Sequence, residues 1–252
     1  MNDQPIRPVA LGDLARRNRQ PEIMDQPELD PARHLAALGG LAQVNWFSRS
    51  VGIVWGPIRR LARRLQRPGS PPSGALRVLD LASGGGDVAI ALARRARRHR
   101  LALEIVGYDR SSTAVEYARS RAADLGVAVR FEVRDVLAQS WDGPFDVVMC
   151  SLFLHHLDEP QASDLLDRMA RTARHLVLVN DLSRSRLGYL VAQVACRTIT
   201  RSDVVRVDGP LSVAAAFRPC EAEGLARRAG LQGARVRRRW PFRFLLTWEP
   251  TS

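Results

Sequence analysis

Two adjacent histidines, His155 and His156, are the side chains of this chain best suited to moving a proton near neutral pH. They follow an apolar run at 145–150 that is typical of a buried strand. An imidazole at this place could take the proton of a phenol or hydroxyl, so that the oxygen becomes a nucleophile. Either histidine is therefore a candidate general base, with His156 slightly favoured. The alternative interpretation is that the pair is structural.

The residues at 80–87 have the pattern of a loop that binds a cofactor. An apolar run ends in Asp80, and three glycines at 84–86 precede a helix-like segment that begins at Asp87. Because glycine has no Cβ, a ligand can approach such a loop closely, and the start of the helix offers free N–H groups. The next apolar run ends in Asp109. A carboxylate at that place can accept hydrogen bonds from both hydroxyls of a ribose.

The histidines and the acids at 80 and 109 can act together only if a sheet places them at the same edge. Apolar runs alternate with helix-like segments through the middle of the chain, which predicts an α/β fold with a doubly wound, mostly parallel sheet. The expected strands are 77–81, 103–108, 129–133, 145–150 and 175–179, and the expected helices are 87–98, 111–125 and 160–173. In such sheets, ligands bind at the carboxyl ends of the strands, where the strand order reverses. We therefore expect Asp80 and the two histidines at the same edge.

In this order, the segments resemble the class I S-adenosylmethionine-dependent methyltransferases, well over residues 76–182 and more loosely elsewhere. The resemblance implies S-adenosylmethionine as the cofactor. It also implies a seven-stranded sheet in the order 3-2-1-4-5-7-6, in which segments 234–239 and 242–248 form a reversed hairpin at the edge.

The same resemblance implies a role for each motif. Asp80 and the 82–86 loop would hold the methionine part of the cofactor. Asp109 would bind its ribose, and Asp135 with the Val136 backbone would contact the adenine edge. The implied cofactor-binding residues are Asp80, Ala82, Ser83, Gly84, Gly86, Asp109, Arg110, Asp135, Val136 and Ser151.

One position departs from the family pattern. Ala82 stands where the family has the first glycine of the loop, so we expect this residue to have a negative φ, at which alanine is tolerated. A dinucleotide-binding domain is the main competing interpretation, and it is weakened because the 82–86 loop does not spell G-x-G-x-x-G. A doubly wound domain without a cofactor is the remaining alternative.

The chain outside the motifs divides into regions of different composition. We expect an N-terminal extension and helical cap over 1–66, a proline-rich linker over 67–75 and the methyltransferase-like domain over 76–252. Within that domain, an insertion at 183–216 follows the fifth strand and should face the substrate. It is expected to be helical over 187–200.

The N-terminal region itself has two parts. Residues 1–30 are polar and contain several prolines, so we expect little regular structure there. A helix is expected over 31–46, with Asp30 as its N-cap. A second helix is expected over 51–65, and it is amphipathic and basic.

Two accessory segments indicate the kind of acceptor. Both Asn45-Trp46-Phe47-Ser48 and Asp208-Gly209-Pro210-Leu211-Ser212 resemble parts of bacterial methyltransferases found with polyketide-type and phenolic-lipid pathways. The resemblance implies O-methylation of a phenolic, polyketide-like or lipid-like small molecule in an apolar pocket. The substrate-side candidates are Trp46, Asn180, Asp181, Asp203, Arg206 and Asp208.

Other functions stay open at this point. A quinone-type C-methyltransferase would use the same cofactor site, and an RNA methyltransferase or a non-catalytic cofactor-binding scaffold are further alternatives. Segment 150–153 lacks the Asn/Asp-Pro-Pro-aromatic pattern of enzymes that methylate exocyclic amino groups. Most nucleic-acid base methylation is therefore disfavoured.

Composition adds expectations about partners and compartment. The formal net charge is +12 and every basic residue is arginine, which favours a solvated surface from a GC-rich genome over a nucleic-acid face. Peripheral contact between the basic helix and an anionic membrane is an alternative, and no nucleic acid partner is expected.

Three widely spaced cysteines predict reduced thiols and no metal site. Without a signal pattern or a long apolar run, we expect a cytoplasmic protein, either a monomer or a homodimer.

Overall fold

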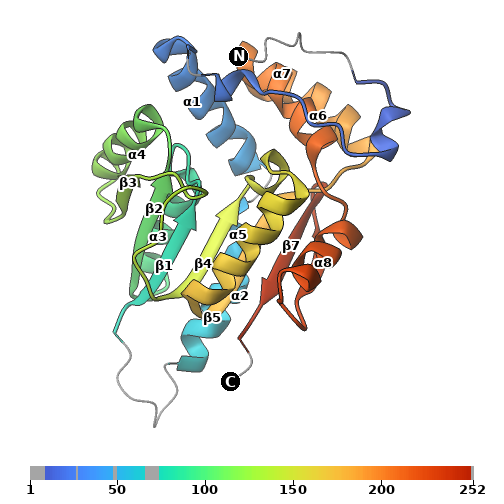
Figure 1. Cartoon of the computed structure of the whole chain (residues 1–252). Coiled ribbons are helices and arrows are strands. Elements are labelled where there is room, and N and C mark those ends of the chain that lie inside the picture. Colours follow the sequence, from blue (N-terminus) through green and yellow to red (C-terminus); the bar gives the residue numbers. More distant parts are fainter. Residues whose placement is uncertain (1–8, 27, 48–49, 66–73, 251–252) are drawn as a thin grey trace.

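The computed structural model describes residues 9–26, 28–47, 50–65 and 74–250 (Figure 1). A seven-stranded sheet runs through the centre, and its order is β3-β2-β1-β4-β5-β7-β6, as the sequence predicts. The strands are β1 Leu76–Leu81, β2 Leu103–Asp109, β3 Arg130–Val133, β4 Phe145–Ser151, β5 Ala173–Leu182, β6 Arg235–Arg239 and β7 Arg243–Trp248.

The strand pairing places the site. Strands β1 to β5 pair in parallel, whereas β7 pairs antiparallel with both β5 and β6. The chain order reverses between the neighbours β1 and β4, so the carboxyl ends of these two strands flank the switch point of the sheet. The central strands β1, β2, β4 and β5 are largely buried, as parallel sheets require, whereas β3 at the edge is partly exposed.

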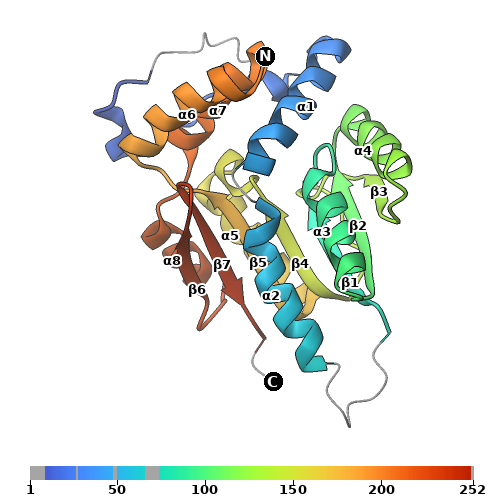
Figure 2. The ribbon, with the colours of Figure 1, turned by 180° about the vertical axis from the view of Figure 1, so that it is seen from behind.

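Helices cover both faces of the sheet. Helices α5 (Glu159–Thr172) and α8 (Pro219–Arg228) pack on one face. Helices α2 (Ser50–Leu65), α3 (Asp87–Arg98) and α4 (Ser112–Asp124) pack on the other (Figures 1 and 2). Each face therefore has its own hydrophobic core, and the sheet separates the two.

The basic helix α2 is part of the second core. Its side chains Val54, Ile58 and Leu61 are each at most 4% exposed, and its arginines Arg60 and Arg63 face solvent. The apolar side of α2 therefore packs against the sheet and is not available to a membrane. A membrane contact through α2 would depend on the charge of its arginines alone. The helical cap expected over 1–66 thus consists of two parts in different positions.

A third layer lies beyond the carboxyl ends of the parallel strands. It contains helices α1 (Pro31–Phe47), α6 (Arg186–Ile199) and α7 (Asp203–Ala215) (Figures 1 and 2). Asp30 caps α1 as predicted, because its Oδ1 accepts a hydrogen bond from Arg33 N at 2.9 Å. Helix α7 was not predicted, since Gly209 and Pro210 in its interior are residues that usually break helices.

Residues 9–26, which we call the strap, cross this layer as an extended segment with two short 3-10 turns. Arg17 anchors the strap by donating to the backbone oxygens of Ala215, His155 and Leu157 at 2.7, 3.0 and 2.9 Å. Asp208 holds it from the other side, since its carboxylate accepts from the N–H groups of Ile23 and Met24 at 2.9 and 3.0 Å. The strap thus has little regular structure, as expected, but it is fixed by buried polar contacts.

Two further expectations concern segment limits. Strand β5 extends to Leu182, so Asn180 and Asp181 lie within the strand and not after it. Most of the expected linker, at 66–73, lies outside the described residues. Within the described ranges, none of the helices combines the length and the apolar character needed to cross a membrane.

Candidate active site

A large cavity lies where the carboxyl ends of the strands meet the third layer. Its volume is about 1170 Å³, which is enough for a nucleotide-sized cofactor together with an acceptor. On the sheet side it is lined by the loops after β1, β2, β3 and β4, and on the other side by the strap, α1, α6, α7 and the β6–β7 turn. The position matches the site expected for this sheet topology.

The glycine loop between β1 and α3 contains one correction to the sequence prediction. Ala82 has a φ of 52°, so the expected negative φ is wrong. The chain turns sharply here, and residue 82 has the left-handed backbone conformation that glycine adopts easily. For alanine this conformation costs about 1–2 kcal/mol of free energy. Gly84 has a φ of 53°. A Cβ on Gly86, whose φ is 73°, would lie 2.6 Å from the Phe131 ring, so Gly86 is required for packing.

Asp109 fixes this loop in addition to facing the cavity. Its Oδ2 accepts from Gly84 N at 2.7 Å and its Oδ1 accepts from Ser111 N at 2.9 Å. A carboxylate has about four lone-pair positions, so both oxygens can still accept a further bond each. The ribose assignment is therefore compatible with the structure, and Asp109 also sets the shape of the loop.

Three carboxylates gather in this part of the cavity. Burial raises the pKa of Asp80 well above its usual range, and the nearby charges of Asp87 and Asp109 raise it further. Burial also raises the pKa values of Asp87 and Asp109 themselves. A cation bound beside these buried acids would favour their ionised forms.

Several buried polar atoms around the cluster are unsatisfied. Within the described residues, Asp80 Oδ1, Ser83 Oγ and Ser151 Oγ have no hydrogen-bond partner. The same holds for both side-chain atoms of Asn180, a residue with 0% exposure on β5. Because buried polar groups are normally paired, these atoms indicate a polar ligand in this half of the cavity.

Each histidine has its shortest ion-pair distance to a different carboxylate, His155 to Asp181 and His156 to Asp25. His155 is 3% exposed, and its Nδ1 lies 2.7 Å from Asp181 Oδ1. Asp181 is itself buried and also accepts from the backbone N–H groups of His155 and Leu182. Burial would raise the pKa of Asp181, but His155 and these hydrogen bonds lower it overall, so the group is an ionised acceptor. In the neutral form of the His155 ring, Nδ1 carries the hydrogen that faces Asp181, and Nε2 is the nitrogen that can accept a proton.

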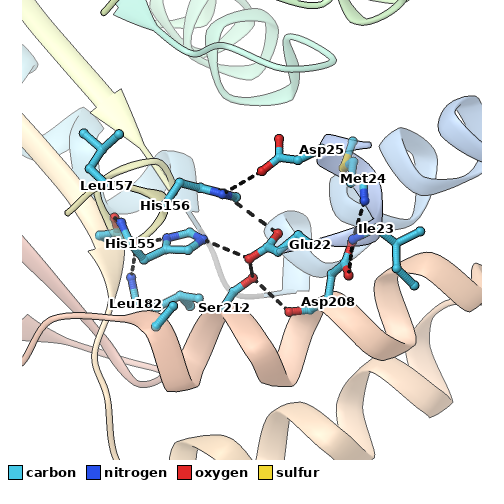
Figure 3. Close-up of polar contacts among 12 residues, drawn as sticks. Glu22, Ile23, Met24, Asp25, His155, His156, Leu157, Leu182, Asp208 and Ser212 are labelled. Carbon is cyan, nitrogen blue, oxygen red and sulfur yellow. Dashed lines mark hydrogen bonds and ion pairs between the residues drawn. The ribbon is translucent and has the colours of Figure 1, made fainter. Parts of the chain in front are cut away.

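His156 is held by the strap. Its Nδ1 lies 3.2 Å from Asp25 Oδ2, and its Nε2 lies 3.9 Å from Glu22 Oε2 (Figure 3). Burial favours the neutral ring, but Glu22 and Asp25 outweigh this and raise the pKa of His156 to about 9. Asp25 also pairs with Arg110 at 2.8 Å, so the strap bridges the histidines and the cofactor side of the cavity.

Glu22 is the centre of this arrangement. Its Oε1 accepts from Ser212 Oγ at 2.7 Å and lies 3.9 Å from His155 Nε2 (Figure 3). Among the described residues, Glu22, His155 and His156 form the group whose ligand atoms are close enough to share a metal ion, within 4.8 Å of one another. The ion pairs and the Ser212 bond already satisfy these groups, so the expectation that no metal is needed stays a prediction.

The cavity brings most of the expected residues together but leaves some outside. Its lining includes His155, His156 and the following expected cofactor residues: Asp80, Ala82, Ser83, Gly84, Asp109, Arg110, Asp135, Val136 and Ser151. Asp135 Oδ1 accepts a hydrogen bond from Leu137 N at 2.8 Å, so Asp135 stabilises the loop after β3. Asn180 and Asp181 lie behind this lining.

Three substrate-side candidates are placed away from the cavity. Trp46 is 76% exposed on α1. Arg206 faces solvent and donates to the backbone oxygens of Thr200 and Arg197. Asp203 is exposed and pairs with Arg33 at 2.6 Å. Asp208 is buried and holds the strap. The contacts of Arg206, Asp203 and Asp208 indicate structural uses, and the substrate roles expected from sequence stay predictions.

The strap residues Glu22 and Asp25 were missed by the sequence interpretation. They lie in a polar, proline-containing segment without periodicity, so no local pattern marked them. The available signal was indirect: residues 1–30 contain more acidic residues than arginines, in a chain whose formal net charge is +12.

Comparisons with known proteins agree with the geometry. Residues 78–175 match a family model described as a methyltransferase domain. The chain is 29% identical over 169 residues to a ubiquinone biosynthesis O-methyltransferase of Ralstonia nicotianae, covering 66% of this chain and 67% of that protein. It is 30% identical over 158 residues to the protein of the same name from Alkalilimnicola ehrlichii, covering 62% and 60%. The matches thus span about two thirds or less of these relatives.

Solved structures share the fold. The S-adenosylmethionine-dependent methyltransferase SibL has a TM-score of 0.59 at 22% identity, covering 82% of this chain and 56% of that one. Magnesium protoporphyrin IX methyltransferase of Synechocystis PCC 6803 has a TM-score of 0.55 at 15% identity, covering 81% and 83%. The strand order, the glycine loop and the acid that ends β2 agree with these matches. Residues 78–175 therefore carry a methyltransferase domain, and the chain has the fold of S-adenosylmethionine-dependent methyltransferases.

Proposed function

We propose that the protein transfers the methyl group of S-adenosylmethionine to a hydroxyl oxygen of a phenolic or quinone-related small molecule, polyketide-like or lipid-like in its apolar part, with His155 as the general base. The observation that carries this proposal is the buried His155–Asp181 pair, 2.7 Å apart, in the wall of the cavity. A histidine oriented by a buried carboxylate is an arrangement that activates an oxygen nucleophile.

The sheet side of the cavity fits the cofactor. S-adenosylmethionine supplies a methyl group that its sulfonium has already activated. The unsatisfied oxygens of Asp80, Ser83 and Ser151 offer acceptors to its polar groups. Burial raises the pKa values of Asp80, Asp87 and Asp109, and the ammonium and sulfonium charges of the cofactor would favour their ionised forms. Arg243, 2% exposed and also in the lining, offers a cation to its carboxylate.

The surroundings of His155 support a role in proton removal. Its Nδ1–H donates to Asp181, so Nε2 accepts the proton of the incoming hydroxyl. The imidazolium that results lies between two carboxylates, because Glu22 Oε1 is 3.9 Å from Nε2. The charge is therefore stabilised as it forms.

His156 is unsuited to the same role. With a pKa of about 9, its ring is already protonated at neutral pH and has no lone pair for a proton. Its position indicates a different use, which is to hold the strap over the cavity through Asp25 and Glu22. We therefore assign the base to His155, the residue that the sequence slightly disfavoured.

The opposite side of the cavity suits an apolar acceptor. Aliphatic and aromatic side chains from α1, α6 and the β6–β7 turn line it, namely Leu38, Leu41, Val44, Val191, Ala192, Ala195, Ile199 and Phe242. The relatives' name, ubiquinone biosynthesis O-methyltransferase, describes methylation of oxygen in the formation of a quinone. This supports transfer to oxygen over the C-methyl and RNA alternatives.

The test is a screen of phenols, catechols and hydroquinones with apolar tails, using methyl-labelled cofactor. With an acceptor in hand, His155→Gln should lower kcat by about 10²–10⁴ while cofactor affinity measured by calorimetry persists. The acidic limb of the wild-type pH–rate profile should be absent in this variant. His156→Gln is the matched control and should retain that limb.

Three outcomes would reject parts of the proposal. A His155→Gln enzyme with a normal rate and profile removes the base assignment. Product NMR that places the label on a ring carbon removes O-methylation. Label that enters RNA and not phenols removes the small-molecule acceptor.

A further inference from the structure

Helix α6 presents an unusual exposed surface. Its residues Leu187, Leu190, Val191 and Val194 are 61, 42, 40 and 64% exposed, and their spacing places them on one side of the helix. The opposite side is buried, with Tyr189 and Cys196 at 5 and 4%. The helix is therefore apolar both where it packs on α7 and where it faces solvent.

A second exposed apolar group adjoins this helix. Trp240, in the β6–β7 turn, is 74% exposed. The turn contacts the start of α6, because a Cβ on Gly188 would lie 3.1 Å from the Phe242 ring. We call Leu187, Leu190, Val191, Val194 and Trp240 together the α6 surface. Apolar groups gathered in this way mark an interaction site, whereas single exposed ones are ordinary.

The charges around the α6 surface have one sign. Helix α6 contains no acidic residue, and its charged residues, Arg186 and Arg197, are exposed. Arg201 beyond its end and Arg237 and Arg238 before the turn are also exposed. The nearby acid Asp203 is paired with Arg33. A helix with an apolar stripe, arginine flanks and an adjacent tryptophan has the composition of one that lies in the interface of an anionic bilayer.

The α6 surface is continuous with the mouth of the cavity. Gly188, Val191, Ala192 and Ala195 of α6 line the cavity, and so do residues 240–242 of the turn. Val191 and Trp240 belong to both the exposed surface and the lining. An opening between α6 and the turn would therefore face whatever covers the surface.

We propose that the α6 surface binds the interface of an anionic lipid bilayer and that a lipid-borne acceptor enters the cavity between α6 and the β6–β7 turn. The second part rests on the proposed function, whereas the first does not. Apolar side chains enter the acyl boundary, and the arginines pair with anionic headgroups. The membrane contact is thus assigned to α6 and not to the basic helix α2, whose apolar side is buried.

The experiment is co-sedimentation of the full chain with vesicles of phosphatidylcholine containing anionic phosphatidylglycerol, without cofactor or acceptor. The test variant is Leu187→Ser/Val194→Ser, whose side chains lie outside the cavity lining. It should bind these vesicles roughly 10- to 100-fold more weakly, because two inserted aliphatic side chains are lost. The matched control, Leu125→Ser/Val133→Ser, changes two exposed side chains of 38 and 53% on the α4–β3 side and should bind as wild type does.

The electrostatic part has its own readout. Wild-type binding should weaken in pure phosphatidylcholine vesicles and at high salt, because headgroup attraction is screened. Methylation of a water-soluble phenol should be the same in wild type and the α6 variant, which keeps a failure here separate from a failure of the proposed function. Equal vesicle binding by wild type and the α6 variant overturns the proposal. So does a dimer, seen by sedimentation velocity, that the α6 variant dissociates while vesicles bind neither protein.

Discussion

The protonation of His156 is a direct test of how the strap closes the site. The ring lies 3.2 Å from Asp25 and 3.9 Å from Glu22, which are residues of a segment more than a hundred positions earlier in the chain. In the unfolded chain these carboxylates are distant, so the ring titrates near its ordinary value of 6.5. In the folded protein, burial lowers its pKa, but the two carboxylates outweigh burial and raise it to about 9.

The size and sign of the effect follow by linkage. Raising a pKa from 6.5 to about 9 corresponds to about 3 kcal/mol in favour of the protonated folded state. Because the folded pKa is the higher one, this stability is fully present below pH 6.5 and is lost as the pH rises through about 9. The difference in unfolding free energy between wild type and His156→Gln should therefore shrink by about 3 kcal/mol between pH 6 and pH 10.

Two measurements check this expectation. Urea unfolding of wild type and His156→Gln at both pH values gives the difference, and other titrating groups cancel in it. The chain has 5 histidines, so NMR of the ring nitrogens with single substitutions can assign His156 and titrate it directly. Asp25→Asn should move that titration toward a lower pH.

His175→Gln is the matched control, because His175 has a side chain 37% exposed at the start of β5, away from the cavity. It should not change the pH dependence. A wild-type to His156→Gln difference that is constant from pH 6 to pH 10, or a ring that titrates near 6.5, would refute the reasoning. The strap would then not be closed over the histidines in solution.

Three more predictions follow from the site. Asp109→Asn should weaken cofactor binding by about 10- to 150-fold in calorimetry, since the charged acceptor is lost and only one side-chain oxygen remains to accept; unchanged affinity in a folded variant would remove the ribose assignment. Ala82→Gly should leave the unfolding free energy unchanged or raise it by up to about 1 kcal/mol, because relief at a φ of 52° opposes the entropy of glycine. The control Ala123→Gly, at an exposed position of α4, should lower it by about 1 kcal/mol, and equal losses in both variants would contradict the strain at Ala82. Chelation with EDTA should leave methyl transfer unchanged; a loss restored by a divalent cation would place an ion at Glu22, His155 and His156.

Local patterns in the sequence determined the sheet and the cofactor loop. A parallel sheet covered by helices on both faces buries the apolar runs and the apolar sides of the amphipathic segments. The observed order of the strands agrees with that interpretation. The glycines at 84–86 and the acid that ends β2 lie close to the strands that position them. Their places are therefore set by the strand, turn and helix that contain them, and Asp109 Oδ2 accepts a hydrogen bond from Gly84 N of the loop.

The tertiary structure alone decided what the remaining segments do. Whether the amphipathic helix α2 faces a membrane or the sheet depends on a neighbour that its own sequence does not contain. The pairing of Glu22 and Asp25 with the histidines depends on where Arg17 and Asp208 hold the strap, through contacts nearly two hundred residues apart in the chain. Such contacts leave no period or spacing in the sequence, because they are fixed by three-dimensional packing. The assignment of the base to His155 and not to His156 has the same origin. The ring of His155 contacts Asp181 of β5, whereas the ring of His156 contacts the strap.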